Sequence, residues 1–83
     1  MGTTRTGSKP EVYLRSDALT LLITRRNLSI SEVARRCGYT RTYFARFLQG
    51  DRHVSERLRV RLMDCLGLIP GDEEDFDRLF RIL

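Results

Sequence analysis

The segment from residue 30 to residue 49 constrains the fold more than any other part of the sequence. Its apolar residues recur at helical spacing in two short stretches, separated by Gly38. The two apolar stripes consist of Val33, Ala34 and Cys37, followed by Phe44 and Phe47. Two helices joined by a short turn must approach closely, and the small side chain of Ala34 permits this approach. The segment therefore predicts two short crossed helices whose outward positions hold mostly arginine.

The residues at the ends of these stretches support the same division. Ser29 and Glu32 have the spacing of a capping box, in which each side chain bonds the backbone amide of the other residue. Gly38 suits the position just after a helix, where a positive φ is common. Thr40 is a good N-cap for a second helix that opens with Arg41. We therefore predict that the helices begin close to residues 30 and 41.

Three further helices are expected around this pair, which makes the fold class all-α. Ser16 is expected to cap a helix of about residues 17–26, and Ser55 one that ends near Leu66. Pro70 and the acidic residues 72–75 favour a fifth helix over residues 71–82. The predicted organisation is a flexible N-terminal arm at residues 1–15 and one domain at residues 16–83. The alternative prediction for residues 11–15 is that they extend the first helix or lie across it.

The predicted fifth helix carries its own apolar stripe: Phe76, Leu79, Phe80 and Leu83. Part of this stripe is expected to cover Val60 and Met63 on the preceding helix. The remainder is the candidate interface of a homodimer. The alternative is that the helix only completes the core of its own chain.

Charge is divided unevenly along the 83 residues. Residues 1–70 hold 13 basic and 6 acidic side chains, a net charge of +7, whereas residues 71–83 hold 2 and 5, a net charge of −3. Fourteen of the fifteen basic residues are arginine, whose planar guanidinium suits bidentate contacts to phosphate or guanine. An ordinary solvated surface is the alternative explanation. Composition alone therefore leaves nucleic-acid binding open.

Other site chemistries find little support in the sequence. Cys37 and Cys65 have no neighbouring cysteine or histidine, so we expect buried thiols rather than a metal site or a disulfide. The chain has no nucleophile paired with a base and no phosphate-binding glycine loop, so no enzymatic activity, cofactor or small-molecule ligand is expected. There is no apolar run of membrane-spanning length and no signal-peptide core, so we expect a cytoplasmic protein without membrane contact.

From about Leu19 to Leu68 the chain resembles the Cro and phage-repressor class of helix-turn-helix proteins, the XRE type. The resemblance is carried by Leu28-Ser29, Glu32-Val33-Ala34, Gly38, Phe44, Phe47, Gly50 and Leu66-Gly67-Leu68. It implies a compact five-helix lambda-repressor-like DNA-binding domain with a central helix-turn-helix. One departure is that Ile23 and Leu48 stand where such repressors often pair arginine with glutamate. We expect these two side chains to be in contact. Because both charged partners are replaced by apolar residues, no buried charge is left without its partner.

The resemblance also implies which residues contact double-stranded DNA. The base-reading positions of the family fall on Arg41, Thr42, Ala45 and Arg46. The two arginines are expected at guanine O6 and N7, with a phosphate contact as the alternative for Arg46. Phosphate contacts are expected from helix ends and flanking loops, at Ser29, Ser31, Thr40, Tyr43, Arg52 and His53.

These interpretations predict a sequence-specific transcriptional regulator, of the repressor kind, that acts as a homodimer. The alternative is a protein-interaction module, such as an antitoxin or an assembly factor, that uses the same fold and its acidic C-terminal segment to hold another protein.

Overall fold

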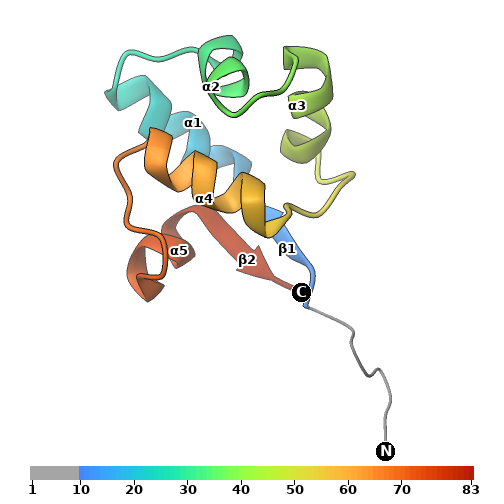
Figure 1. Cartoon of the computed structure of the whole chain (residues 1–83), viewed down its shortest axis with the longest axis vertical. Coiled ribbons are helices and arrows are strands. Elements are labelled where there is room, and N and C mark those ends of the chain that lie inside the picture. The colour runs from blue at the N-terminus through green and yellow to red at the C-terminus, as the bar shows by residue number, and fades with distance from the viewer. Residues whose placement is uncertain (1–9) are drawn as a thin grey trace, which may run out of the picture.

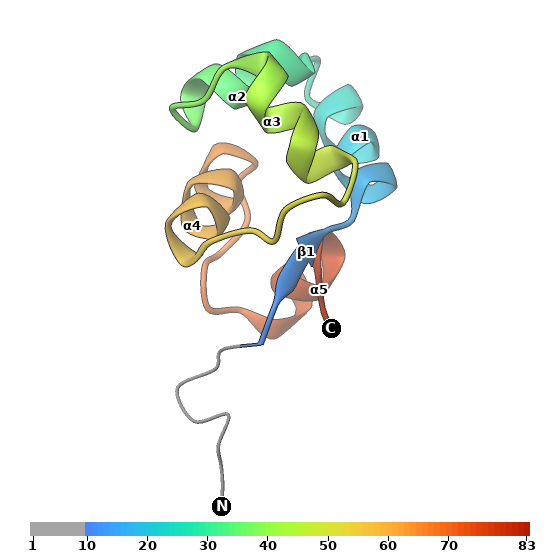
Figure 2. The same cartoon turned by 90° about the vertical axis from the view of Figure 1, so that its right-hand side faces the viewer.

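Five short helices and a two-stranded sheet make up the computed structural model, which describes residues 10–83 (Figure 1). In chain order the elements are β1 (Val12–Leu14), α1 (Ser16–Arg25), α2 (Ile30–Arg36), α3 (Arg41–Leu48), α4 (Glu56–Cys65), α5 (Glu73–Leu79) and β2 (Phe80–Ile82). Figures 1 and 2 place α2 and α3 at one end of the molecule, and α5 with the strands at the other. The prediction of five helices is confirmed, but the fold is mostly rather than wholly α.

The helix starts agree with their sequence signals at three of the predicted caps. The Ser29 hydroxyl accepts from the Glu32 amide and the Glu32 carboxylate accepts from the Ser29 amide, both at 3.1 Å, so the capping box is present. Thr40 caps α3 and Ser55 caps α4 through the same kind of bond. Ser16 is different, because it is the first residue of α1 and its hydroxyl donates to the carbonyl oxygen of Leu48 instead.

One apolar core lies between all the helices and the sheet. Its largest fully buried side chains are Phe44, Phe80, Leu19, Leu58, Leu62, Leu66 and Leu79. Ile23 is buried and Leu48 packs against the same core, although their direct contact stays a prediction. Met63 is buried, whereas Val60 remains 45% exposed, so the predicted cover of Val60 by the C-terminal stripe is wrong. No helix between residues 10 and 83 has the length and apolar character needed to cross a membrane.

The two strands correct the sequence interpretation at both ends of the domain. β1 pairs antiparallel with β2, with Val12 opposite Ile82 and Leu14 opposite Phe80. Residues 12–14 are therefore neither part of a flexible arm nor an extension of α1, because Val12 and Leu14 bury their side chains on one face of the sheet. Residues 1–9 of the predicted arm lie outside the described residues.

The C-terminal segment is also different from its prediction. α5 ends at Leu79, and the backbone becomes extended at Phe80, where φ is −129° and ψ is 161°. Leu79 and Phe80 are fully buried within their own chain, so neither is available to a dimer interface. Phe76 is half-buried against Phe80, and of the four candidate interface residues Leu83 alone is largely exposed, at 69%. A seven-residue helix is too short to present the predicted stripe to a partner.

Candidate nucleic-acid interface

Helix α3 is held against the core from one side, which leaves its opposite side free. Phe44 and Phe47 are buried beneath it and anchor its inner face. At its amino end, Thr40 accepts from the Tyr43 amide at 3.1 Å. At its carboxyl end, the Ser16 hydroxyl donates to the Leu48 carbonyl, which has no partner inside the helix. The orientation of α3 is thus fixed by the core and by contacts at both ends.

The four predicted base-reading residues all lie on α3, away from its buried face. Arg41, Thr42 and Arg46 are exposed, and Ala45 between them is half-buried. Arg41 and Thr42 occupy the first turn, and Arg46 lies in the last turn, so these side chains extend along both turns of this short helix. A helix end of this kind, with donors at its tip and a small residue between them, has the shape that the major groove of DNA accepts.

An aromatic cluster flanks this helix on the side of the following loop. The rings of Tyr39 and Tyr43 are stacked, with centroids 5.3 Å apart and planes inclined by 24°. Phe47 meets both rings edge-on at 5.8 Å and 5.6 Å. The guanidinium of Arg52 lies 5.2 Å from the centroid of the Tyr43 ring, which is cation–π geometry. The cluster therefore ties the loop after α3 to the turn before it.

A recess of about 490 Å³ opens beside this aromatic cluster. Its lining includes Tyr13, Tyr39, Tyr43, Arg46, Arg52 and His53, together with the acidic residues Glu11 and Asp51. Three of the predicted phosphate-contacting residues, Tyr43, Arg52 and His53, are thus brought together at one place. Ser29, Ser31 and Thr40 are exposed but lie elsewhere, at the starts of α2 and α3, and the hydroxyls of Ser29 and Thr40 are occupied by helix caps.

Tyr39 and Tyr13 are among the lining residues of the recess that sequence reasoning did not assign to a site. Tyr39, in the turn before α3, stacks on Tyr43, four positions later, and meets the ring of Phe47 edge-on. The spacing of the two tyrosines, four positions apart, was the feature of the sequence that could have predicted their stacking. No nearby residue in the sequence indicates that Tyr13 lies at the recess, because β1 reaches that position through pairing with the C-terminal strand.

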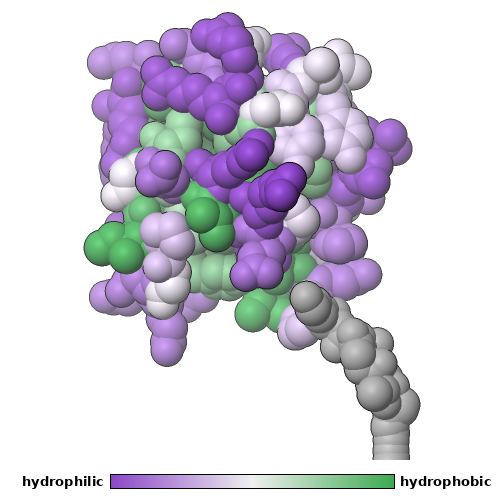
Figure 3. All heavy atoms as spheres, viewed as in Figure 1, coloured by the Kyte–Doolittle hydropathy of each residue, from purple (hydrophilic) through white to green (hydrophobic). Residues whose placement is uncertain are grey.

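The surface around α2 and α3 differs from the rest of the molecule. The large exposed apolar side chains among residues 10–83 are Leu21, Val60, Ile69, Ile82 and Leu83, and none of them lies between residues 30 and 49. Figure 3 accordingly shows hydrophilic to intermediate side chains over the end formed by α2 and α3, with strongly apolar patches lower down. This end of the molecule is therefore suited to a charged partner rather than to an apolar one.

The described residues contain little that suggests catalytic or metal chemistry. Cys37 and Cys65 are free, and burial raises the pKa of the Cys37 thiol to about 11, with a further contribution from Cys65. A thiol with that pKa is protonated near pH 7 and is a poor nucleophile. Between residues 10 and 83, no three histidine, cysteine or acidic side chains gather closely enough to hold a metal ion.

Comparison with known proteins gives one match. A family described as a helix-turn-helix domain matches residues 14–76, which is more than half of the chain and includes α1 to α4. No curated protein and no solved structure matches the chain. The matched region contains the crossed helices, the exposed face of α3 and most of the recess. The chain therefore belongs to the helix-turn-helix family of DNA-binding domains.

Proposed function

We propose that this chain is a sequence-specific transcriptional regulator that inserts the amino end of α3 into the major groove of double-stranded DNA. The observation that carries the proposal is the exposure of Arg41, Thr42 and Arg46 on a helix whose other side is anchored by Phe44 and Phe47. The succession of one helix before the crossed pair and two after it supports placing the chain in the Cro and phage-repressor class. As a member of that class, it acts as a binding module without enzymatic activity.

Each residue on the exposed side of α3 has a distinct role in this proposal. Arg41 and Arg46 donate to O6 and N7 of guanine, the acceptor pair that guanine presents in the major groove. Thr42 donates to a base edge or packs its methyl group on thymine. Ala45 is short enough to let the helix approach the base pairs closely. Recognition thus depends on two guanidinium groups whose residues are about 1.4 helical turns apart.

The recess beside α3 supplies the contacts to the DNA backbone. Tyr43, Arg52 and His53 line it together, and a phosphate at its mouth meets a hydroxyl and a guanidinium there. Ser29, Ser31 and Thr40 lie at helix starts, where backbone amides and the helix dipole favour an anion. Each neutralised phosphate adds about 0.9 to the slope of log affinity against log salt concentration. Affinity should therefore fall steeply as salt is raised, and a flat response would contradict this arrangement.

The active species in this proposal is a homodimer that represses transcription at an operator with two half-sites. Two-fold pairing of proteins of this size doubles the DNA surface that is contacted. The candidate interface residues are the exposed Ile82 and Leu83 and the half-buried Phe76. Leu83 lines a recess together with Leu48 and Gln49 at the carboxyl end of α3, so an interface there lies away from the first turn of that helix. Sedimentation at several protein concentrations, with and without DNA, measures the oligomeric state directly.

Selection of bound fragments from random DNA, followed by affinity measurement on the selected site, tests the proposal. Arg41→Ala should lower discrimination at one base pair by roughly 1–3 kcal/mol. Arg78→Ala is the matched control, because Arg78 is exposed on α5 and its ion pair with Asp75 is remote from α3. If Arg41→Ala weakened binding to all sequences equally, Arg41 would not read a base.

The second candidate function is a protein-interaction module, such as an antitoxin or an assembly factor. It is favoured by the opposite end of the molecule, where the acidic α5 lies beside the exposed Ile82 and Leu83. Failure to select any DNA sequence, combined with salt-insensitive binding to random fragments, would favour this second function over the first.

A further inference from the structure

The turn between α2 and α3 is stabilised from outside by one arginine of α4. The Cys37 amide donates to the Val33 carbonyl at 3.0 Å and the Tyr39 amide to the Ala34 carbonyl at 2.9 Å, which closes the end of α2. The Cys37 carbonyl belongs to the group of helix-end carbonyls that have no partner within a helix. Arg61 Nη1 donates to this oxygen at 3.0 Å, across 24 positions of sequence.

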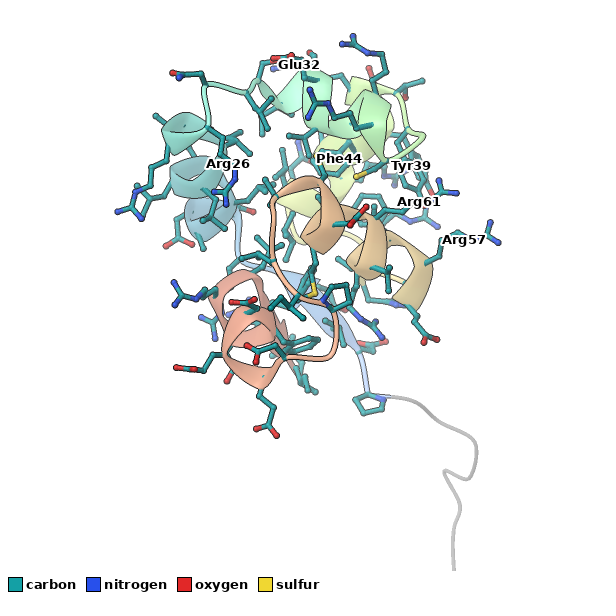
Figure 4. The ribbon with its side chains drawn as sticks, turned by 60° about the vertical axis from the view of Figure 1, so that its left-hand side comes forward. Arg26, Glu32, Tyr39, Phe44, Arg57 and Arg61 are labelled. Atoms are coloured by element: carbon teal, nitrogen blue, oxygen red, sulfur yellow. The ribbon has the colours of Figure 1, made fainter. Side chains whose placement is uncertain are left out.

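The same guanidinium also lies over the glycine of the turn. Gly38 has a φ of +88°, and a Cβ atom built there would be 2.9 Å from Arg61 Nη1. Figure 4 shows Arg61 extending from α4 toward the turn that holds Tyr39, whereas Arg57, one helical turn earlier, points away from it. The positive charge also lies at the carboxyl end of α2, where the helix dipole favours a cation. Arg61 therefore contacts both of the features that define the geometry of the turn.

We propose that Arg61 is a positioning residue, which locks the turn after α2 and so sets the angle at which α3 presents Arg41 and Arg46 to DNA. The inference rests on the proposed DNA-binding function. Arg61 donates this hydrogen bond to a group of the protein itself and not to DNA. The main effect of Arg61 is therefore on sequence discrimination rather than on nonspecific attraction to phosphate. An arginine that contacted phosphate would act on all DNA sequences alike.

The test compares Arg61→Gln with Arg57→Gln, because the two changes remove the same charge from neighbouring turns of one helix. Affinity is measured for a selected DNA site and for random DNA over a range of salt concentrations. Arg61→Gln should lower the ratio of specific to nonspecific affinity by about tenfold, as expected for the loss of a charged hydrogen bond to a carbonyl. Its salt slope should equal that of Arg57→Gln, and Arg57→Gln should leave the ratio unchanged.

A second measurement does not depend on DNA. In the free protein, Arg61→Gln should accelerate hydrogen exchange of the Gly38 and Tyr39 amides about tenfold, while the exchange of α1 amides stays as in the wild type. Arg61→Lys, which keeps the charge, should restore part of this protection.

Three results would overturn the proposal. The first is an unchanged affinity ratio for Arg61→Gln. The second is an equal loss for specific and random DNA with a smaller salt slope than that of Arg57→Gln, which would make Arg61 a phosphate contact. The third is unchanged exchange at the turn. If the wild type selected no DNA site while exchange at the turn rose as expected, the locking role would stand and the proposed function would fail instead.

Discussion

Replacing Phe80 with alanine tests whether the C-terminal strand belongs to the core of one chain or to a dimer interface. Phe80 is fully buried, and its ring centroid is 5.3 Å from that of Phe76. Truncating a buried phenylalanine removes apolar contacts and leaves a cavity, which destabilises a domain by about 3–5 kcal/mol. A chain of 83 residues is expected to have a free energy of unfolding of about 4–12 kcal/mol. Phe80→Ala should therefore remove a large part of the stability of the domain.

The assay is urea unfolding followed by circular dichroism, at two protein concentrations that differ tenfold. The midpoint for Phe80→Ala should fall by the same amount at both concentrations, because contacts within one chain do not depend on association. Phe76→Ala is the control and should lose less, since Phe76 is only half-buried. A loss below about 1 kcal/mol for Phe80→Ala would refute the burial argument. A concentration dependence that is present in the wild type and abolished in Phe80→Ala would place Phe80 in the dimer interface.

Two further predictions concern the turn after α2 and the cysteine beside it. Gly38→Ala should lower the free energy of unfolding more than Gly50→Ala in thermal denaturation. Both glycines have a positive φ, which disfavours alanine by about 1–2 kcal/mol. Only at residue 38 would a Cβ atom also displace the Arg61 guanidinium, which then loses its hydrogen bond to the Cys37 carbonyl, so equal losses would argue against this arrangement. The pKa of Cys37 is raised from 9.0 to about 11 in the folded protein, so the thiol ionises at lower pH in the unfolded chain. The contribution of Cys37 to stability is therefore complete below pH 9 and is lost as the pH rises from 9 to about 11. Cys37→Ala should therefore show a smaller decrease in stability than the wild type over this range in urea titrations, and an identical decrease would contradict the assignment.

The parts of the fold that were predicted correctly depend on interactions between residues close in sequence. The capping box of Ser29 and Glu32 spans three positions, and the turn at Gly38 depends on the conformation of a single residue. The apolar spacing of Phe44 and Phe47 sets which side of α3 is buried, and hence which side carries Arg41. The exposed face of the candidate site follows directly from these local signals.

The parts that were missed depend on pairing between the two ends of the chain. Val12 and Leu14 alternate over only three residues, which is too short a pattern to indicate a strand by itself. Their partners, Ile82 and Phe80, are separated from them by more than sixty positions, so no local signal joins them. Phe80 fits both a helical stripe and a strand, and burial against the core decides between the two.

The same long-range contacts explain why the helix-turn-helix pair needs the rest of the domain. Helices of seven and eight residues, as α2 and α3 are, do not persist in water through their own hydrogen bonds. Here Ser16 of α1 bonds the carboxyl end of α3, and Arg61 of α4 bonds the carboxyl end of α2. Each short helix is therefore fixed at its otherwise unsatisfied end by a side chain from a neighbouring helix. The exposed side of α3, which we propose faces DNA, makes none of these contacts. Its residues are therefore free to vary while the scaffold that orients them is retained.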